Sequence, residues 1–198
     1  MSRVFSPLFI RLWRENPIFY DVLGICSALA VTTRVSNALV MGTAVTITAG
    51  CTNMMVSFLR PLLHRFIRLV VEMLLIATFV ILFDVVLQAF FYDMSRELGP
   101  YVGLIVTNCI LLGRAEAFAL QNPVLPSLLD GIGSGLGYAW VLTAVAVCRE
   151  ILGSGTLAGF RILPEQAHPA HAILLPPGAF FILGILVWIT NRKGGRPS

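Results

Sequence analysis

The stretch VSNALVMGTAVTITAGCTNMMVSFL, residues 35–59, contains no charged side chain and decides the fold class. A helix needs about 20 apolar residues to cross the bilayer core. Three more stretches are long and mostly apolar: residues 69–92, 131–148 and 172–191. The chain is 57% hydrophobic and only 12% charged, where a soluble domain is about a quarter charged. The sequence therefore predicts an all-α membrane protein with lipid as its main solvent.

Two further apolar segments are too short to span a bilayer as straight helices. Val22–Thr33 carries Cys26 near its middle, and Gly99–Gly113 carries Cys109. Each segment is followed by two longer spans. Short segments at corresponding positions of two halves indicate an inverted repeat with a site near the membrane midplane. The alternative is a pair of ordinary short helices in a tilted bundle.

From this pattern we predict a single membrane domain, residues 1–198, with six transmembrane helices. It consists of two inverted three-helix repeats, about 1–97 and 98–198, because an odd number of spans per half turns the second half upside down.

The basic residues indicate how the chain lies in the membrane. The net charge of +4 comes from short clusters between apolar runs, which favours topology signals over nucleic-acid binding. With both termini in the cytoplasm and loops 91–97 and 154–171 outside, ten of the fourteen basic residues lie inside. These ten are Arg3, Arg11, Arg14, Arg60, Arg65, Arg68, Arg114, Arg192, Lys193 and Arg196.

The four cysteines all lie in apolar segments, and none forms a CxxC pair. A membrane cysteine is by default a small packing residue, and we interpret Cys51 and Cys148 in this way. Cys26 and Cys109 differ, because an inverted repeat would bring the two short segments together at the pseudo-two-fold axis. Two thiolates there would be half of a four-thiolate iron–sulfur or zinc site.

Carboxyl groups within apolar spans are functional candidates, because they are unfavourable in lipid unless paired or hydrated. Asp84 is the deepest, and Asp130 opens a glycine-rich span. Both are candidates for a cation path or a partner interface. Glu72 lies nearer a span end and could be interfacial. The alternatives for all three are an ion pair with a neighbouring subunit or a snorkelling end residue.

The densest glycine run is GIGSGLG, residues 131–137. Its spacing does not match a nucleotide-binding loop, and no strand is expected before it. Gly131/Gly135 and Gly133/Gly137 form two overlapping GxxxG pairs, which predict close helix packing.

Four motifs carry a resemblance to a known family: LGICSALAVTT (23–33), TNCILLGRAEAF (107–118), DGIGSGLGY (130–138) and REILGSG (149–155). Together they resemble the D-type subunits of the sodium-translocating NADH:quinone oxidoreductase, in the right order and over nearly the whole chain. The related E subunit of the Rnf ferredoxin:NAD oxidoreductase complex has a close version of the second motif. Ser27 favours the first family, whereas residues 175–180 look more like the Rnf form.

The resemblance implies a function in electron transport. The D and E subunits of that enzyme are related six-helix proteins of opposite topology. Each contributes two cysteines, from its broken first and fourth helices, to one intramembrane 2Fe-2S cluster. The ligands that match here are Cys26 and Cys109. The cluster carries electrons across the bacterial inner membrane between flavins on other subunits, from NADH toward ubiquinone, while sodium is driven outward. We identify no flavin-attachment threonine motif, so the resemblance implies a subunit without its own flavin that is not catalytic alone.

Two other classes of function remain open at this stage. A secondary transporter also uses inverted repeats and membrane carboxylates, but without a metal. A structural or assembly subunit would use its cysteines only for packing.

Overall fold

The computed structural model describes residues 23–64, 66–90, 92, 96, 99–154, 156–157, 160–161 and 176–193. In chain order its elements are α3 (Ile25–Val31), α4 (Val35–Leu59), α5 (Arg68–Phe90), the 3-10 turn η1 (Gly99–Tyr101), α7 (Val102–Val106), α8 (Cys109–Arg114), the π-helical turn η2 (Ala115–Ala119), α9 (Val124–Ser154), β1 (Thr156–Leu157), β2 (Phe160–Arg161) and α11 (Pro176–Lys193). β1 and β2 pair as a short antiparallel hairpin. The loops on which the predicted orientation depends lie largely outside the described residues.

The predicted helical membrane fold is confirmed. Four helical stretches in the described part are long and apolar enough to cross a membrane: Val35–Leu59, Arg68–Phe90, Gly99–Ala119 and Val124–Ile151. With α3 and the shorter apolar helix α11, they account for the six predicted membrane segments. The two-fold relation between the halves stays a prediction.

One predicted span, residues 131–148, is shorter than the helix that contains it. α9 begins at Val124 and ends at Ser154. The charged residues at which the sequence pattern stops, Asp130 and Arg149, are both buried within the helix, and other parts of the chain bind them. Because both side chains form hydrogen bonds inside the protein, they do not end the helix.

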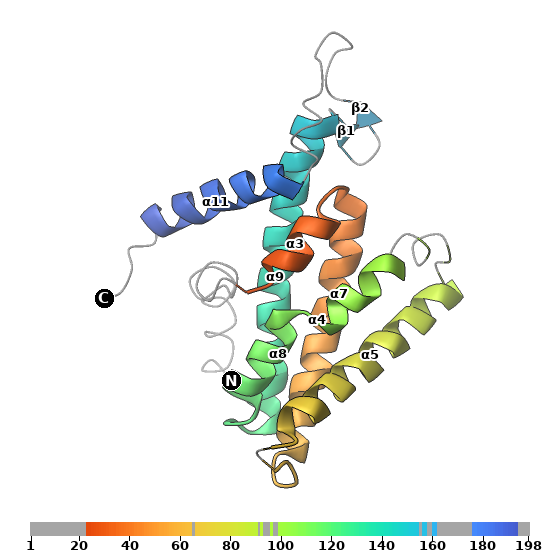
Figure 1. The fold of residues 1–198 in the computed structure, drawn as a ribbon, viewed down its shortest axis with the longest axis vertical. Coiled ribbons are helices and arrows are strands. Elements are labelled where there is room, and N and C mark those ends of the chain that lie inside the picture. The colour runs from red at the N-terminus through yellow and green to blue at the C-terminus, as the bar shows by residue number, and fades with distance from the viewer. Residues whose placement is uncertain are drawn as a thin grey trace.

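The centre of the fold is the long contact between α4 and α9, which run side by side (Figure 1). The predicted glycine packing is confirmed there for Gly131 and Gly135. A Cβ atom on Gly131 would lie 2.6 Å from the carbonyl oxygen of Ala49, and one on Gly135 would lie 2.5 Å from Cα of Thr46. Small residues let two backbones approach closely, which is how membrane helices gain packing energy without a hydrophobic driving force.

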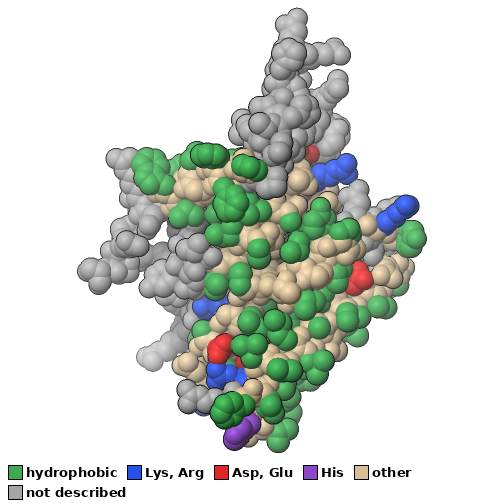
Figure 2. Space-filling view, viewed as in Figure 1, with side chains coloured by type: hydrophobic (Ala, Val, Ile, Leu, Met, Phe, Trp, Pro, Cys, Tyr) green, Lys and Arg blue, Asp and Glu red, His purple; other side chains and the backbone are tan. Residues whose placement is uncertain are grey.

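Helix α5 meets α4 near the loop that joins them and diverges from it further along, where α7 lies between the two (Figure 1). The outer face of α5 is apolar and exposed. Leu74 and Leu82 are 66% and 63% exposed, and hydrophobic side chains are spread over α5 and α11 in Figure 2. An apolar surface of this extent is typical of contact with lipid or other subunits.

One helix of the bundle is interrupted, and another begins at a left-handed glycine. α3 begins directly after Gly24, whose φ of +83° is left-handed, a conformation that favours glycine. The interruption lies at Thr107 and Asn108, between α7 and α8. The fourth membrane segment is therefore broken, as predicted. The residues before Leu23 lie outside the described part.

Candidate functional site

The start of α3 lies against the interruption between α7 and α8. The backbone N–H of Gly24 donates a hydrogen bond to Sγ of Cys109, at 2.9 Å, across 85 positions of sequence. The contact requires glycine, because a Cβ atom at position 24 would lie 2.6 Å from Cδ1 of Ile110. Cys26 follows two residues after Gly24, in the first turn of α3. The structure therefore brings the two short segments together, as the sequence pattern predicts.

A buried polar network joins the start of α3 and the start of α8 to α9. Oγ of Ser27 lies 2.5 Å from Oη of Tyr138. Nδ2 of Asn108 donates to Oγ of Ser27 at 3.2 Å and lies 3.5 Å from Oη of Tyr138. All three side chains are fully buried. This Ser27–Asn108–Tyr138 network fixes α3 and α8 relative to each other.

Asn108 has a second role in the network, because it caps α8. Its Oδ1 accepts from the backbone N–H of Ile110 at 3.1 Å. A helix leaves its first N–H groups without partners, and Asn is among the residues that best satisfy them. The cap starts α8 at Cys109, so the same side chain that binds Ser27 also sets where the cysteine lies.

The other end of α3 is held by Arg149 of α9. Its Nη1 donates to the carbonyl oxygen of Leu29 at 3.1 Å and to Oγ1 of Thr32 at 2.7 Å. The neighbouring Glu150 accepts from the N–H of Val35, the first residue of α4, at 2.9 Å. Arg149 and Glu150 therefore fix the junction between α3 and α4.

The two cysteines suit half of a shared metal cluster. Cys26 is exposed and Cys109 half-buried in this chain, and both thiols lie close enough to the Tyr138 hydroxyl to interact with it electrostatically. Cluster sulfurs are commonly tuned by hydrogen-bond donors, and Gly24 supplies one. Within the described residues, no three Cys, His, Asp or Glu side chains gather into a metal site. The two thiols thus fit two ligands of a cluster that needs further ligands beyond the described residues.

Cys51 and Cys148 lie away from this junction. Cys51 is half-buried in α4, and Cys148 is exposed near the end of α9. Neither takes part in the Ser27–Asn108–Tyr138 network.

The two candidate carboxylates have different surroundings. Asp130 is 3% exposed and accepts two hydrogen bonds from Arg114, from Nη2 at 2.6 Å and from Nε at 3.2 Å. Its ion-pair partner therefore lies in the same chain. Asp84 is half-buried on α5 and accepts from the amide Nε2 of Gln88 at 2.9 Å. The structure does not place either carboxylate beside Cys26 and Cys109.

Sequence reasoning missed three residues that shape the site: Asn108, Tyr138 and Arg149. Asn108 had a usable signal, because an Asn directly before a predicted helix start is typical of an N-cap. Tyr138 and Arg149 had none, since their partners Ser27 and Thr32 are more than 100 positions away.

Comparison with known proteins agrees with the predicted resemblance. The family model described as "Rnf-Nqr subunit, membrane protein" matches residues 4–187. A relative from Chlamydia pneumoniae, the D subunit of a Na(+)-translocating NADH-quinone reductase, is 46% identical and covers 96% of this chain and 94% of its own length. The D subunit of the same enzyme from Aeromonas hydrophila is 49% identical, over 90% of this chain and 88% of its own. The chain belongs to the Rnf-Nqr family of membrane subunits.

Proposed function

We propose that this chain is the D-type membrane subunit of a sodium-translocating NADH:quinone reductase. In this proposal Cys26 and Cys109 supply two of the four thiolate ligands of a 2Fe-2S cluster. A paralogous six-helix subunit of inverted topology supplies the other two. The observation that carries the proposal is the hydrogen bond from the Gly24 N–H to Cys109 Sγ, because it holds the starts of α3 and α8, each with a cysteine, at one point. The names of the relatives support the choice of complex.

When bound, the cluster supplies a one-electron carrier inside the membrane. The residues of this chain hold and shield it. Gly24 donates to one ligand sulfur, Asn108 sets the start of α8, and Arg149 anchors the far end of α3. The interrupted backbone is tolerated at this depth because it is buried in protein and its polar groups are bonded.

The wider assignment follows the same relatives. We place the chain in the bacterial inner membrane with both termini cytoplasmic, beside flavin-bearing and NADH-oxidising subunits, and without a flavin of its own. Electron transfer through it toward ubiquinone is coupled to sodium export. Asp84 and Asp130 lie near the cation path or a partner interface in this proposal.

Single substitutions in the purified complex test the cluster. Cys26→Ser and Cys109→Ser should each abolish the cluster's share of iron and acid-labile sulfide and stop quinone reduction. Cys51→Ser and Cys148→Ser are matched controls in equally apolar helices and should keep both. Full iron and full turnover in Cys26→Ser and Cys109→Ser would leave a transporter or scaffold as the function. Ferredoxin-dependent rather than quinone-dependent turnover in the wild type would instead assign an E subunit of an Rnf complex.

A further inference from the structure

The side chain of Glu72, near the start of α5, is buried without a hydrogen-bond partner among the described residues. Its exposed fraction is 0%, and both carboxylate oxygens are unsatisfied there. A buried ionised carboxylate is strongly unfavourable unless something compensates its charge. In a membrane protein such a group marks a functional site by default.

A second set of unsatisfied polar atoms lies on α4. Thr52 and Asn53 are each 1% exposed. Oγ1 of Thr52 and both Oδ1 and Nδ2 of Asn53 have no hydrogen-bond partner in the part of the chain that the structure describes. Buried polar groups in native proteins are nearly always bonded, so adjacent unsatisfied side chains call for a ligand.

Helix geometry puts these residues level with Glu72. Ala44 of α4 and Val80 of α5 line the same small cavity. Thr52 lies eight positions after Ala44, and Glu72 lies eight positions before Val80. Since the two helices form an antiparallel hairpin and converge toward their connecting loop (Figure 1), a rise of about 12 Å along each brings Thr52 opposite Glu72.

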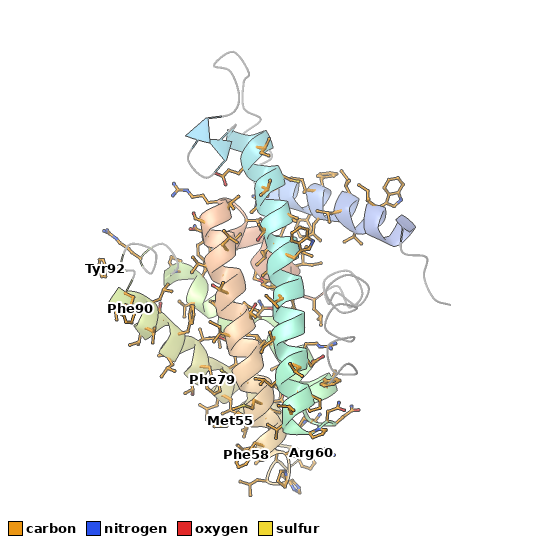
Figure 3. All side chains as sticks on the ribbon, turned by 180° about the vertical axis from the view of Figure 1, so that it is seen from behind. Met55, Phe58, Arg60, Phe79, Phe90 and Tyr92 are labelled. Carbon is orange, nitrogen blue, oxygen red and sulfur yellow. The ribbon has the colours of Figure 1, made fainter. Side chains whose placement is uncertain are left out.

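The next turn of α4 shows which way the face of Thr52 is turned. Val56, four positions after Thr52, packs in one cluster with Leu75 of α5 and with Ala115 of η2. Met55 and Phe58, near the same end of α4, are 36% and 69% exposed instead (Figure 3). The face that carries Thr52 and Val56 is therefore turned inward, toward α5 and η2. Asn53 lies on another face, with Gly50 and Ser57, which contact α9 and the residues just before it.

A charged pair lies beside Glu72 at its solvent side. Arg68, one turn before Glu72, forms an ion pair with Glu116 of η2, and both interact electrostatically with Glu72. Their side chains are 32% and 44% exposed, which gives the buried carboxylate a polar route to the outside. When both carboxyl groups are ionised, Arg68 balances one of them, so the three groups together keep one negative charge.

We propose that Glu72 and Thr52 form a binding site for a partly dehydrated monovalent cation of about the size of sodium, reached past the Arg68–Glu116 pair. Glu72 supplies the charged ligand, and the hydroxyl oxygen of Thr52 supplies a neutral one. The choice of sodium rests on the proposed function. The oxygen site itself is independent of the cysteines.

The charge and the ligands favour a monovalent ion. One uncompensated carboxylate neutralises one positive charge. Calcium is usually bound by several carboxylates, and magnesium keeps much of its water shell, which a buried site between packed helices does not accommodate. The hydroxyl oxygen of Thr52 replaces water around a small hard cation.

Carbodiimide labelling of the purified, detergent-solubilised complex tests the site. Labelling of the Glu72 carboxyl is measured by peptide mass spectrometry in sodium chloride and in potassium chloride of equal ionic strength. Sodium should protect Glu72. Glu150, which is bonded to the N–H of Val35 at the other end of α4, should label equally in both salts.

One substitution and a control variant sharpen the test. Thr52→Val keeps the approximate shape of the side chain and should raise the sodium concentration for half-protection at least tenfold. A second variant, Asn37→Leu, removes a buried α4 amide whose oxygen is unsatisfied among the described residues, about 23 Å away along the helix from Thr52. It should leave the protection curve unchanged.

Bound ²²Na⁺ is counted in parallel on the same preparations. Glu72→Gln should bind one sodium fewer per complex than the wild type, with unchanged iron content. Equal counts, or labelling of Glu72 that is the same in sodium and potassium, would overturn the cation site. If the cluster proposal fails instead, sodium protection of Glu72 will persist although no iron is bound by Cys26 and Cys109.

Discussion

The junction between the starts of α3 and α8 differs from the buried end of the α4–α5 hairpin in how its polar groups are bonded. At the junction, the side chains of Ser27, Asn108 and Tyr138 are fully buried and each is bonded to another. At the hairpin, Thr52 and Glu72 are equally buried but have no hydrogen-bond partner among the described residues. Both regions lie in the same apolar bundle, so burial alone does not distinguish them.

The difference indicates two kinds of site. A satisfied network is rigid and specifies one arrangement, which suits ligands that must be held in place for electron transfer. An unsatisfied pocket stays unfavourable until a ligand enters, which suits an ion that binds and leaves. The first region is therefore a scaffold for a resident group, and the second is a site for a passing one.

Breaking a satisfied buried pair should have the largest effect. Asp130→Asn leaves Arg114 without its bidentate partner, and removing one member of a buried ion pair destabilises by about 3–5 kcal/mol. Thermal unfolding of the purified complex should show this loss. Asp84→Asn, on the half-buried face of α5, should change stability by less than about 1 kcal/mol.

The same two variants test the proposed cation path through their kinetics. Both should weaken the sodium dependence of turnover, with more sodium needed for half-maximal rate. Unchanged sodium kinetics in both, with normal assembly, would leave Asp130 and Asp84 with structural roles only.

Filling the unsatisfied pocket should have an intermediate effect. At a sodium concentration about 100 times the dissociation constant, binding stabilises the folded complex by about 2.7 kcal/mol. The unfolding temperature of the wild type should therefore rise when sodium replaces potassium. Glu72→Gln should lose this dependence and be at least as stable as the wild type in potassium, because an uncompensated buried charge is gone. A wild-type unfolding temperature that is the same in sodium and in potassium would remove the distinction between the two regions.

Trimming the satisfied network should have the smallest effect on stability. Tyr138→Phe removes the hydroxyl that contacts Ser27 and Asn108. The loss should lower the free energy of unfolding by about 1 kcal/mol. Its signature should be spectroscopic, as a shift in the electron paramagnetic resonance of the reduced cluster. Thr143→Val, which removes a hydroxyl bonded to Ala139 of the same helix, should cost no more stability and should leave the signal in place.

The sequence predicts the parts of this fold that depend on local composition. Residues 35–59 have no charge and form α4 with the predicted bounds. The glycine spacing predicts the close approach of α9 to α4. The ends of α9 could not be predicted, because Asp130 and Arg149 look like span boundaries until their distant partners Arg114 and Thr32 are known.

The candidate site also has a part that the sequence predicts and a part that it does not. The pairing of the segments around Cys26 and Cys109 is predictable from their matching positions in the two halves. Tyr138 is not, since a tyrosine in an apolar helix has no local mark of its distant partners. The pocket at Glu72 was missed for a similar reason, because only packing shows that Thr52 faces it with a hydroxyl unsatisfied by the described residues.

The most direct test of the shared cluster is to locate iron in the assembled complex. Anomalous diffraction at the iron edge, or high-resolution electron microscopy of the same sample, should place a two-iron centre at the junction where Gly24 approaches Cys109. We predict four sulfur ligands, two from Cys26 and Cys109 and two from a paralogous subunit. An iron-free junction in an active complex, or a cluster ligated by neither cysteine, would contradict the shared cluster.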